Sequence, residues 1–321
     1  MRCSAALFTL ALVAVFGCGT TFAQDSKPLR ILVGFPPGGG TDVVARTLSR
    51  GLNDALAVPV LVENRPGAGG QIAAQALRAA TPDGKTLFIT HDHTISILPQ
   101  VIRNPGFDPR RDFVPVAGCA TFVNALAVSG GTPARNFNDY VAWVRSRGGR
   151  SAIGIPAPAS VPEFLVKVIA DNYKLDLVAA PYRGSAPMIA DMLGNQIPAA
   201  VGSVPELIEN HRAGKLRVVA VLGGARQSVM PEVPTFTELG LAGFEDVPYY
   251  GFFAPAGTPQ ALIDEFSSAL ARVLAMPDVR ERLTTIGLTI DFMTQRQLDA
   301  RVRAYTRTWT EIIRRTGFQP Q

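Results

Sequence analysis

Bare peptide N–H groups, rather than reactive side chains, are the first groups in this sequence that could do chemistry. Residues 34–46 read GFPPGGGTDVVAR, with two prolines and three glycines between an apolar run and a helix start. Glycine has no Cβ, so a ligand can approach the backbone, and Thr41 is placed to cap a helix beginning near Asp42. N–H groups at a helix start favour anions such as carboxylates. The stretch predicts either a carboxylate site or a tight turn that binds nothing.

A second glycine-rich stretch, VENRPGAGGQIAAQAL, spans residues 62–77 and runs from an expected strand into an expected helix. Neither stretch matches a nucleotide motif, because the G-x-G-x-x-G order with a later ribose-binding acid and the Gly-Lys-Ser/Thr ending are both missing. Asp42 would also repel a highly charged phosphate. Two such loops on one edge of a sheet predict one wall of a cleft for a singly charged carboxylate.

Some polar side chains allow both functional and structural interpretations. His91 and His93 flank Asp92 in THDHT, which allows a metal site, a ligand contact or a plain loop. Zinc needs three or four protein ligands, and the other histidine, His211, is distant in sequence, so we expect no metal and no cofactor. Arg183 could pair with a ligand carboxylate, bridge two lobes or face solvent.

The sequence offers little support for an enzyme. It contains three histidines, no G-x-S-x-G nucleophile turn and no cysteine that spacing brings beside a histidine. A carboxylate pair, Asp42 and Asp92, is the one formal possibility for catalysis. Cys119 is expected to be a small buried hydrophobe. Tyr250 is expected near the start of a strand, where it faces either the cleft or the core.

An alternating α/β chain must position these groups. Continuous apolar runs of strand length occur at 29–35, 58–64, 85–90, 124–130, 150–156, 176–182, 197–203, 216–223 and 249–255. Helical spacing occurs at 41–55, 71–80, 137–147, 160–173, 185–194 and 204–212. Repeated strand-then-helix order predicts parallel or mostly parallel sheets with helices on both faces.

Residues 1–23 are expected to be a signal peptide, because an apolar stretch follows Arg2 and small residues end at Ala23. Residues 15–18 also resemble a lipoprotein cleavage box, which would leave a lipid on Cys18. The remaining length exceeds what one core usually serves, so two domains are expected. The formal charge of +5 is dispersed, which argues against nucleic-acid binding. The sequence therefore predicts an exported protein.

Eight short segments occur in a recognisable order: FPPGGGTD, VENRPGAGG, TPDGKTL, PYRGSAP, AGKLRVVAV, PEVPTFTELGLAGF, GFFAPAGTP and PDVRERL. They resemble the Bug/TctC family, the extracytoplasmic solute receptors of tripartite tricarboxylate transporters. The resemblance covers essentially all of the chain after the signal peptide. It implies a two-lobed, type II-like periplasmic binding fold with mixed, mostly parallel sheets, and an interdomain cleft that closes on a small carboxylate, amino acid or related anion.

The resemblance also implies an organisation into lobes and a set of partners. We expect lobe 1 to comprise residues 24–123 plus 247–321 and lobe 2 residues 124–246. The partners implied are a small organic acid or amino acid and the large and small membrane subunits of a tripartite transporter. The receptor is expected to be a monomer. The alternatives are an orphan periplasmic sensor of the same fold and, least favoured, an exported enzyme acting on a small acid.

The second lobe departs from the family pattern. IPAPASVPEF stands where the family usually has a glycine-rich segment ending Gly-Thr-Ser, which leaves Ser160 at the hydroxyl position. VGSVPE puts Gly202 and Ser203 where the family often carries Asp-Thr. Loss of that acid predicts a more anionic or less amine-bearing ligand.

The expected ligand contacts combine the two glycine loops, the histidine segment and groups near helix starts of lobe 2, with no catalytic residue. They are Phe35, Pro37, Gly38, Gly39, Gly40, Thr41, Asp42, Ala68, Gly69, His91, Ser160, Arg183, Ser185, Ser203 and Tyr250. Among them, the resemblance implies that amides of residues 38–41 and 68–69, with ordered waters, hold one carboxylate.

Overall fold

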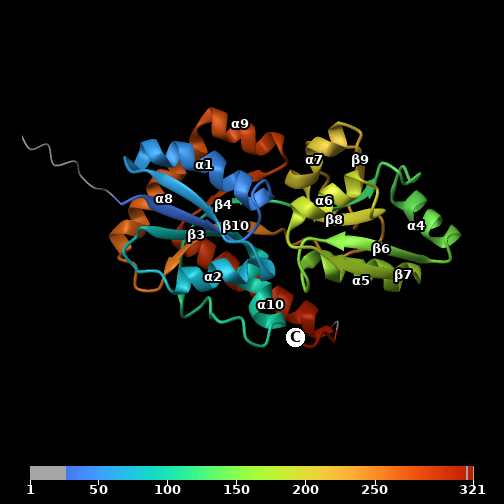
Figure 1. Cartoon of the computed structure of the whole chain (residues 1–321), viewed down its shortest axis with the longest axis horizontal. Helices are drawn as coiled ribbons and strands as arrows, with labels where there is room; N and C mark the ends of the chain where they lie inside the picture. Colours follow the sequence, from blue (N-terminus) through green and yellow to red (C-terminus); the bar gives the residue numbers. More distant parts are fainter. Residues whose placement is uncertain (1–26, 316, 321) are drawn as a thin grey trace, which may run out of the picture.

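The computed structural model describes residues 27–315 and 317–320, which form two α/β lobes side by side (Figure 1). The expected signal peptide, residues 1–23, and Cys18 lie outside the described residues. None of the described helices is both long enough and apolar enough to cross a bilayer.

The first lobe is built on a six-stranded sheet in the order β11-β4-β10-β3-β1-β2. Its strands are β1 (Leu29–Val33), β2 (Val60–Asn64), β3 (Thr86–His91), β4 (Phe113–Thr121), β10 (Tyr249–Pro255) and β11 (Thr289–Met293). Its helices are α1 (Gly40–Leu56), α2 (Gln71–Arg78), α3 (Leu98–Val101), α8 (Gln260–Ala275), α9 (Pro277–Thr285) and α10 (Gln295–Arg315). A short 3-10 turn, η1 (Ala68–Gly70), precedes α2, and a π-helix, η2 (His93–Ile97), follows β3.

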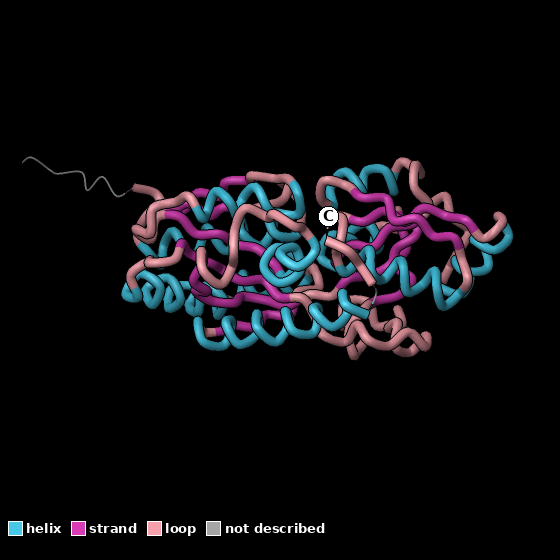
Figure 2. The backbone as a smooth tube through the Cα atoms, turned by 90° about the horizontal axis from the view of Figure 1, so that it is seen from below, coloured by secondary structure: helices cyan, strands magenta, loops and turns pink. Residues whose placement is uncertain are grey.

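The second lobe is built on a five-stranded sheet in the order β7-β6-β8-β5-β9. Its strands are β5 (Asn124–Ser129), β6 (Arg150–Ile155), β7 (Asp176–Pro181), β8 (Ala199–Ser203) and β9 (Leu216–Val221). Its helices are α4 (Phe137–Ser146), α5 (Val161–Tyr173), α6 (Ser185–Leu193) and α7 (Val204–Arg212). Figure 2 shows the strands of both lobes enclosed by helices.

The sheets are mixed, but the expectation that they are mostly parallel is wrong. Among the described strands, four pairings are parallel and five are antiparallel. The reason is the path of the chain between lobes, since β4 leaves the first sheet, β5 begins the second, and β10 re-enters the first. A strand-helix-strand unit makes its two strands parallel, but strands that enter a sheet after crossing from the other lobe are not part of such a unit and can pair antiparallel.

All nine apolar runs form strands, whereas β4 and β11 were not predicted. β4 contains Pro115, which lowers the strand signal because proline cannot donate to a ladder. The ladder between β4 and β10 shifts register between Phe252 and Phe253, and Pro115 lies opposite Phe253 at that irregularity. A bulge therefore accommodates the proline in an otherwise buried strand.

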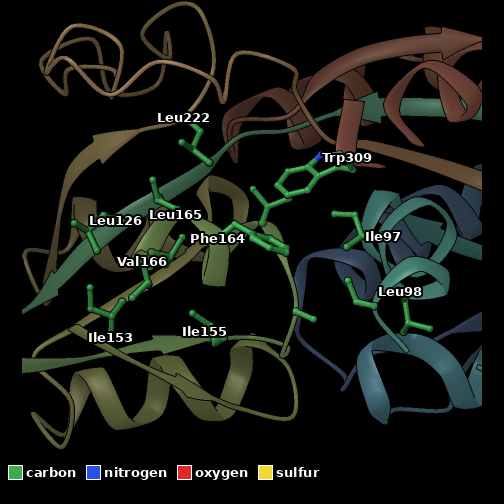
Figure 3. Packing of buried hydrophobic residues seen from close by; sticks show 14 of the residues in the cluster. Ile97, Leu98, Leu126, Ile153, Ile155, Phe164, Leu165, Val166, Leu222 and Trp309 are labelled. Carbon is green, nitrogen blue, oxygen red and sulfur yellow. The ribbon is translucent and has the colours of Figure 1, made fainter. Parts of the chain in front are cut away.

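Helix α10 links the two lobes through the hydrophobic core. Its Trp309 belongs to a buried cluster that includes residues of both sheets. The Trp309 ring lies 5.4 Å from the ring of Phe164 in α5. Figure 3 shows the two side chains next to each other. The C-terminus accordingly lies where the two lobes meet (Figures 1 and 2).

Candidate ligand-binding site

Asp42 organises the start of α1. Its carboxylate is buried and accepts from Gly38 N–H at 2.9 Å, from Asn64 Nδ2 at 2.8 Å and from Arg46 Nε at 3.0 Å. Burial alone would raise the pKa of Asp42, but these hydrogen bonds and the Arg46 charge together lower it. The residue thus has a complete set of internal partners. Neither Asp42 nor residues 37–40 are among those that line the two hollows described below.

A carboxylate of the second lobe already occupies the start of α1. Gly40 N–H donates to Glu206 Oε1 at 2.9 Å, and Ser203 N–H donates to Glu206 Oε2 at 3.2 Å. The neighbouring N–H of Gly39 donates to the carbonyl oxygen of Pro36 at 3.2 Å. The two oxygens of Glu206 therefore join its own helix start in lobe 2 to a glycine amide in lobe 1.

A hollow with about 520 Å³ of empty space lies beside this contact and draws its walls from both lobes. It is lined by Phe35, Thr41, His91, Asp92, His93, Phe122, Asn124, Pro156, Ala157, Ser160, Val161, Pro162, Ser185, Ser203, Glu206 and Tyr250. The predicted contacts that it brings together are Phe35, Thr41, His91, Ser160, Ser185, Ser203 and Tyr250.

Three helices of the second lobe begin at this hollow. Ser160 is the N-cap of α5, Ser203 is the N-cap of α7, and Ser185 is the first residue of α6. Ser160 Oγ donates to the carbonyl oxygen of Ala157 at 2.6 Å. Ser203 is only 5% exposed; its Oγ faces the N–H of Glu206 in a capping box but makes no full hydrogen bond. Because first-turn N–H groups lack helical partners and carry the positive end of the helix dipole, this wall favours a carboxylate.

The first-lobe wall is largely aromatic. The ring of Phe35 stacks on His91 at 4.8 Å, and Phe122 lies 4.7 Å from Tyr250. Burial, with a smaller contribution from the charge of Glu206, raises the pKa of Tyr250 well above its ordinary value. The Tyr250 hydroxyl is therefore neutral, and this wall offers apolar surface with a few neutral polar groups.

His93 begins the π-helix η2, and His91 ends β3, so the His-Asp-His segment is not a plain loop. Burial and the neighbouring His91 lower the pKa of His93 to about 4, which leaves its ring neutral near pH 7. His93 is only 4% exposed, and its Nδ1 has no hydrogen-bond partner. Buried polar atoms are normally paired, so His93 Nδ1 and Ser203 Oγ are exceptional among the residues that line the hollow.

The second glycine loop lines a different hollow, which encloses about 630 Å³. Ala68, Gly69 and Arg183 line it, and only Phe35 and Pro156 line both hollows. Gly69 has a φ of 65°, and a Cβ there would lie 2.5 Å from the His93 Nε2, so glycine is required for this close approach. Gly34, Phe35 and Pro36 of the first glycine-rich stretch line this hollow beside the second loop, whereas residues 37–40 line neither hollow. The joint hold of the two loops on a carboxylate stays a prediction.

Nine lining residues of the interlobe hollow were absent from the predicted contacts: Asp92, His93, Phe122, Asn124, Pro156, Ala157, Val161, Pro162 and Glu206. Gly202 and Ser203 carry no acid, but Glu206, three residues after Ser203, supplies a carboxylate from the second lobe. A signal was present in the sequence. Ser-Val-Pro-Glu occurs at both 160–163 and 203–206, and both copies begin a helix.

Other reactive side chains have structural surroundings. Cys119 is buried, and burial raises the pKa of its thiol. His91 Nδ1 lies 3.2 Å from Asp92 Oδ1. Within residues 27–315 and 317–320, no group of three His, Cys, Asp or Glu side chains is arranged to hold a metal ion.

Comparison with known proteins decides the family. A family model described as the tripartite tricarboxylate transporter family receptor matches residues 44–318. The chain belongs to this receptor family. Protein BugT of Bordetella pertussis is 29% identical to the receptor over 96% of this chain and 97% of its own. The recognition made from the eight segments is therefore confirmed.

Solved structures agree with the two-lobed periplasmic binding fold of the receptor. The structure of the periplasmic binding protein BugD is 27% identical, with a TM-score of 0.87, over 92% of this chain and 99% of that chain. MatC from Rhodopseudomonas palustris, solved with bound malate, is 27% identical, with a TM-score of 0.83, over 90% and 99% of the two chains. The expected fold class is thus confirmed.

Proposed function

We propose that this protein is a periplasmic receptor that captures a small carboxylate-bearing solute between its lobes and delivers it to the membrane subunits of a tripartite transporter. One observation carries the proposal: the interlobe hollow gathers three helix starts and two unpaired buried polar atoms, Ser203 Oγ and His93 Nδ1. The malate bound to the relative MatC supports a carboxylate as the ligand class.

The solute is proposed to bind at the second-lobe helix starts, with its carboxylate at Ser160, Ser185 and the N–H groups beside them, and with Ser203 as a further polar contact. Phe35 and Tyr250 would pack against the carbon skeleton of the solute. The amides of the first glycine loop become available to a ligand only when the lobes part, because Gly40 N–H is held by Glu206 in this closed arrangement.

We take the lobes to be residues 24–123 plus 247–321 and residues 124–246, so that the chain crosses between them twice, near residues 122–125 and 246–250. Phe122 N–H donates to the carbonyl oxygen of Pro248 at 3.2 Å, which joins the crossings to each other. Helix α10 adds the ion pair between Arg301 and Asp246, at 2.6 Å, next to the second crossing. A hinge here would let the lobes open and close, and a solute that contacts both lobes would shift the population toward the closed form.

A thermal-shift screen tests the receptor proposal with mono- and dicarboxylates, amino acids and aromatic acids. A solute present at 100 times its dissociation constant should stabilise the folded protein by about 2.7 kcal/mol. Recovery of the bound compound unchanged, checked by NMR, is expected of a receptor, whereas a chemically altered product would contradict it. Loss of uptake of that compound in a deletion strain would support delivery to a transporter, and normal uptake would favour the sensor alternative.

A further inference from the structure

The second lobe uses the same four residues twice at the wall of the hollow. Ser-Val-Pro-Glu begins α5 at residues 160–163 and α7 at residues 203–206. In the first copy, Glu163 Oε2 accepts from Ala159 N–H at 2.5 Å, within its own loop. In the second copy, Glu206 holds its own helix start and also reaches Gly40 across the cleft. Glu206 lines the hollow and Glu163 does not.

The charge of Glu206 has no cationic partner. Both of its partners are backbone N–H groups, and none of the ion pairs formed within residues 27–315 and 317–320 includes it. A carboxylate oxygen has two lone pairs, so each oxygen of Glu206 can accept a further hydrogen bond after its backbone N–H. The side chain therefore offers a charged acceptor to the hollow.

The hollow as a whole carries more negative than positive charge. Its described lining includes two carboxylates, Asp92 and Glu206, and no lysine or arginine. His91 lies beside Asp92 at 3.2 Å, and the ring of His93 is neutral near pH 7. A second carboxylate on the solute would meet this surplus of negative charge, while a protonated amine would offset it.

We propose that the solute carries a protonated amine beside its carboxylate, and that Glu206 is the residue that recognises the amine. This inference rests on the proposed receptor function, and it names the ligand class as a zwitterion rather than a dianion. The carboxylate lies at the starts of α5 and α6, where helix dipoles favour it, and the ammonium group lies toward Glu206. The cleft thus gives the two ends of the solute opposite electrostatic surroundings.

Isothermal titration calorimetry with matched probes tests this inference. The pairs are L-alanine and L-lactate, L-aspartate and L-malate, and L-glutamate and L-2-hydroxyglutarate, which differ only by an ammonium group in place of a hydroxyl. The amino acid of the pair that fits the hollow should bind at least tenfold more tightly than its hydroxy acid. Equal or tighter binding of the hydroxy acid overturns the inference but leaves the receptor function intact.

Two variants assign the preference to its residue. Glu206→Gln keeps an acceptor for a backbone N–H but removes the charge, and it should bring the amino-to-hydroxy affinity ratio close to one. The matched control, Glu163→Gln, changes the same position of the twin helix start and should keep the wild-type ratio. An unchanged ratio in Glu206→Gln overturns the assignment to Glu206. If no small carboxylate of any kind binds the wild-type protein, the proposed receptor function itself is overturned, and this inference falls with it.

Discussion

The two Ser-Val-Pro-Glu helix starts of the second lobe show how one local motif can serve two purposes. At α5, the glutamate binds the N–H of Ala159 and the serine hydroxyl binds the carbonyl oxygen of Ala157, so both polar groups are satisfied within the turn. At α7, the glutamate reaches the opposite lobe through Gly40, and the hydroxyl of Ser203 is left unpaired in the hollow. The capping side chains of the first start thus bind only their own turn, whereas the glutamate of the second start also binds the opposite lobe.

The difference comes from what faces each helix start. Position 40 is a glycine, and a Cβ there would lie 2.9 Å from Tyr250 Oη and 3.3 Å from Glu206 Oε1. Absence of a side chain lets the carboxylate reach the amide of α1. A capping motif therefore fixes how a helix begins, whereas the opposite wall decides whether the capping residues also take part in binding.

Acidification should produce the largest change in stability, because it protonates His93 in the first-lobe wall of the hollow. Burial, with the charge of His91, lowers the pKa of His93 from 6.5 to about 4. Between pH 6.5 and pH 4, His93 is protonated in the unfolded chain but neutral in the folded chain. The free energy of unfolding therefore falls as the pH drops from about 6.5 to about 4. The loss should reach at most about 3 kcal/mol.

Chemical denaturation at a series of pH values measures this loss. His93→Asn should flatten the dependence between pH 6.5 and 4, while His211→Asn, at a histidine outside the hollow, should leave its shape unchanged. A dependence that is equally steep in His93→Asn would show that other groups cause it.

Removal of the Glu206 side chain should weaken the contact between the lobes, whereas removal of the Glu163 side chain should not. Glu206→Ala loses a charge-assisted contact between the lobes, which should shift the unliganded protein toward open forms by about 2 kcal/mol, or roughly tenfold or more in population. Glu163→Ala should instead cost about 1 kcal/mol of unfolding free energy, as for a lost cap, without opening the lobes. Small-angle X-ray scattering of the two variants distinguishes these outcomes, and an equal radius of gyration in both would contradict the interlobe role of Glu206.

The two serines should give the smallest effects, with opposite signatures. Ser160→Ala removes a satisfied hydroxyl and should lower the unfolding free energy by about 1 kcal/mol. Ser203→Ala removes a buried unpaired hydroxyl, so the stability of the unliganded protein should change by less than about 0.5 kcal/mol while solute affinity falls severalfold. Denaturant melts and calorimetry on both variants measure these quantities, and a large stability loss in Ser203→Ala would mean that its hydroxyl has a structural partner.

Much of the fold followed from the sequence, because buried strands are continuous apolar runs and three of the lobe 2 helix starts carry serine. The antiparallel pairings did not follow, since they depend on where the chain crosses between lobes. β4 was not predicted as a strand because Pro115 weakens its strand pattern. The bulge that accommodates this proline forms only when β4 pairs with β10 in the sheet. Local sequence patterns therefore predicted most helices and strands, but not which strands pair with each other.

The candidate site was predictable at its edge but not in its detail. Serines at helix starts and aromatic residues on strands were found from local pattern, and the hollow brings Ser185 and Tyr250 together. Glu206 was missed because capping explains it fully within its own helix, and its second partner lies 166 residues away in the chain. The two glycine-rich stretches do border one hollow, through residues 34–36 and 67–69. The amides of residues 38–40 line neither hollow, because Asp42, Pro36 and Glu206 accept from them.

A crystal structure of the protein with a confirmed small amino acid tests the account most directly. The account predicts that the carboxylate of the solute lies at the helix starts of Ser160 and Ser185 and that its amine lies within hydrogen-bond distance of Glu206. A solute bound instead in the hollow of Ala68 and Arg183, or with its amine turned away from Glu206, would contradict it.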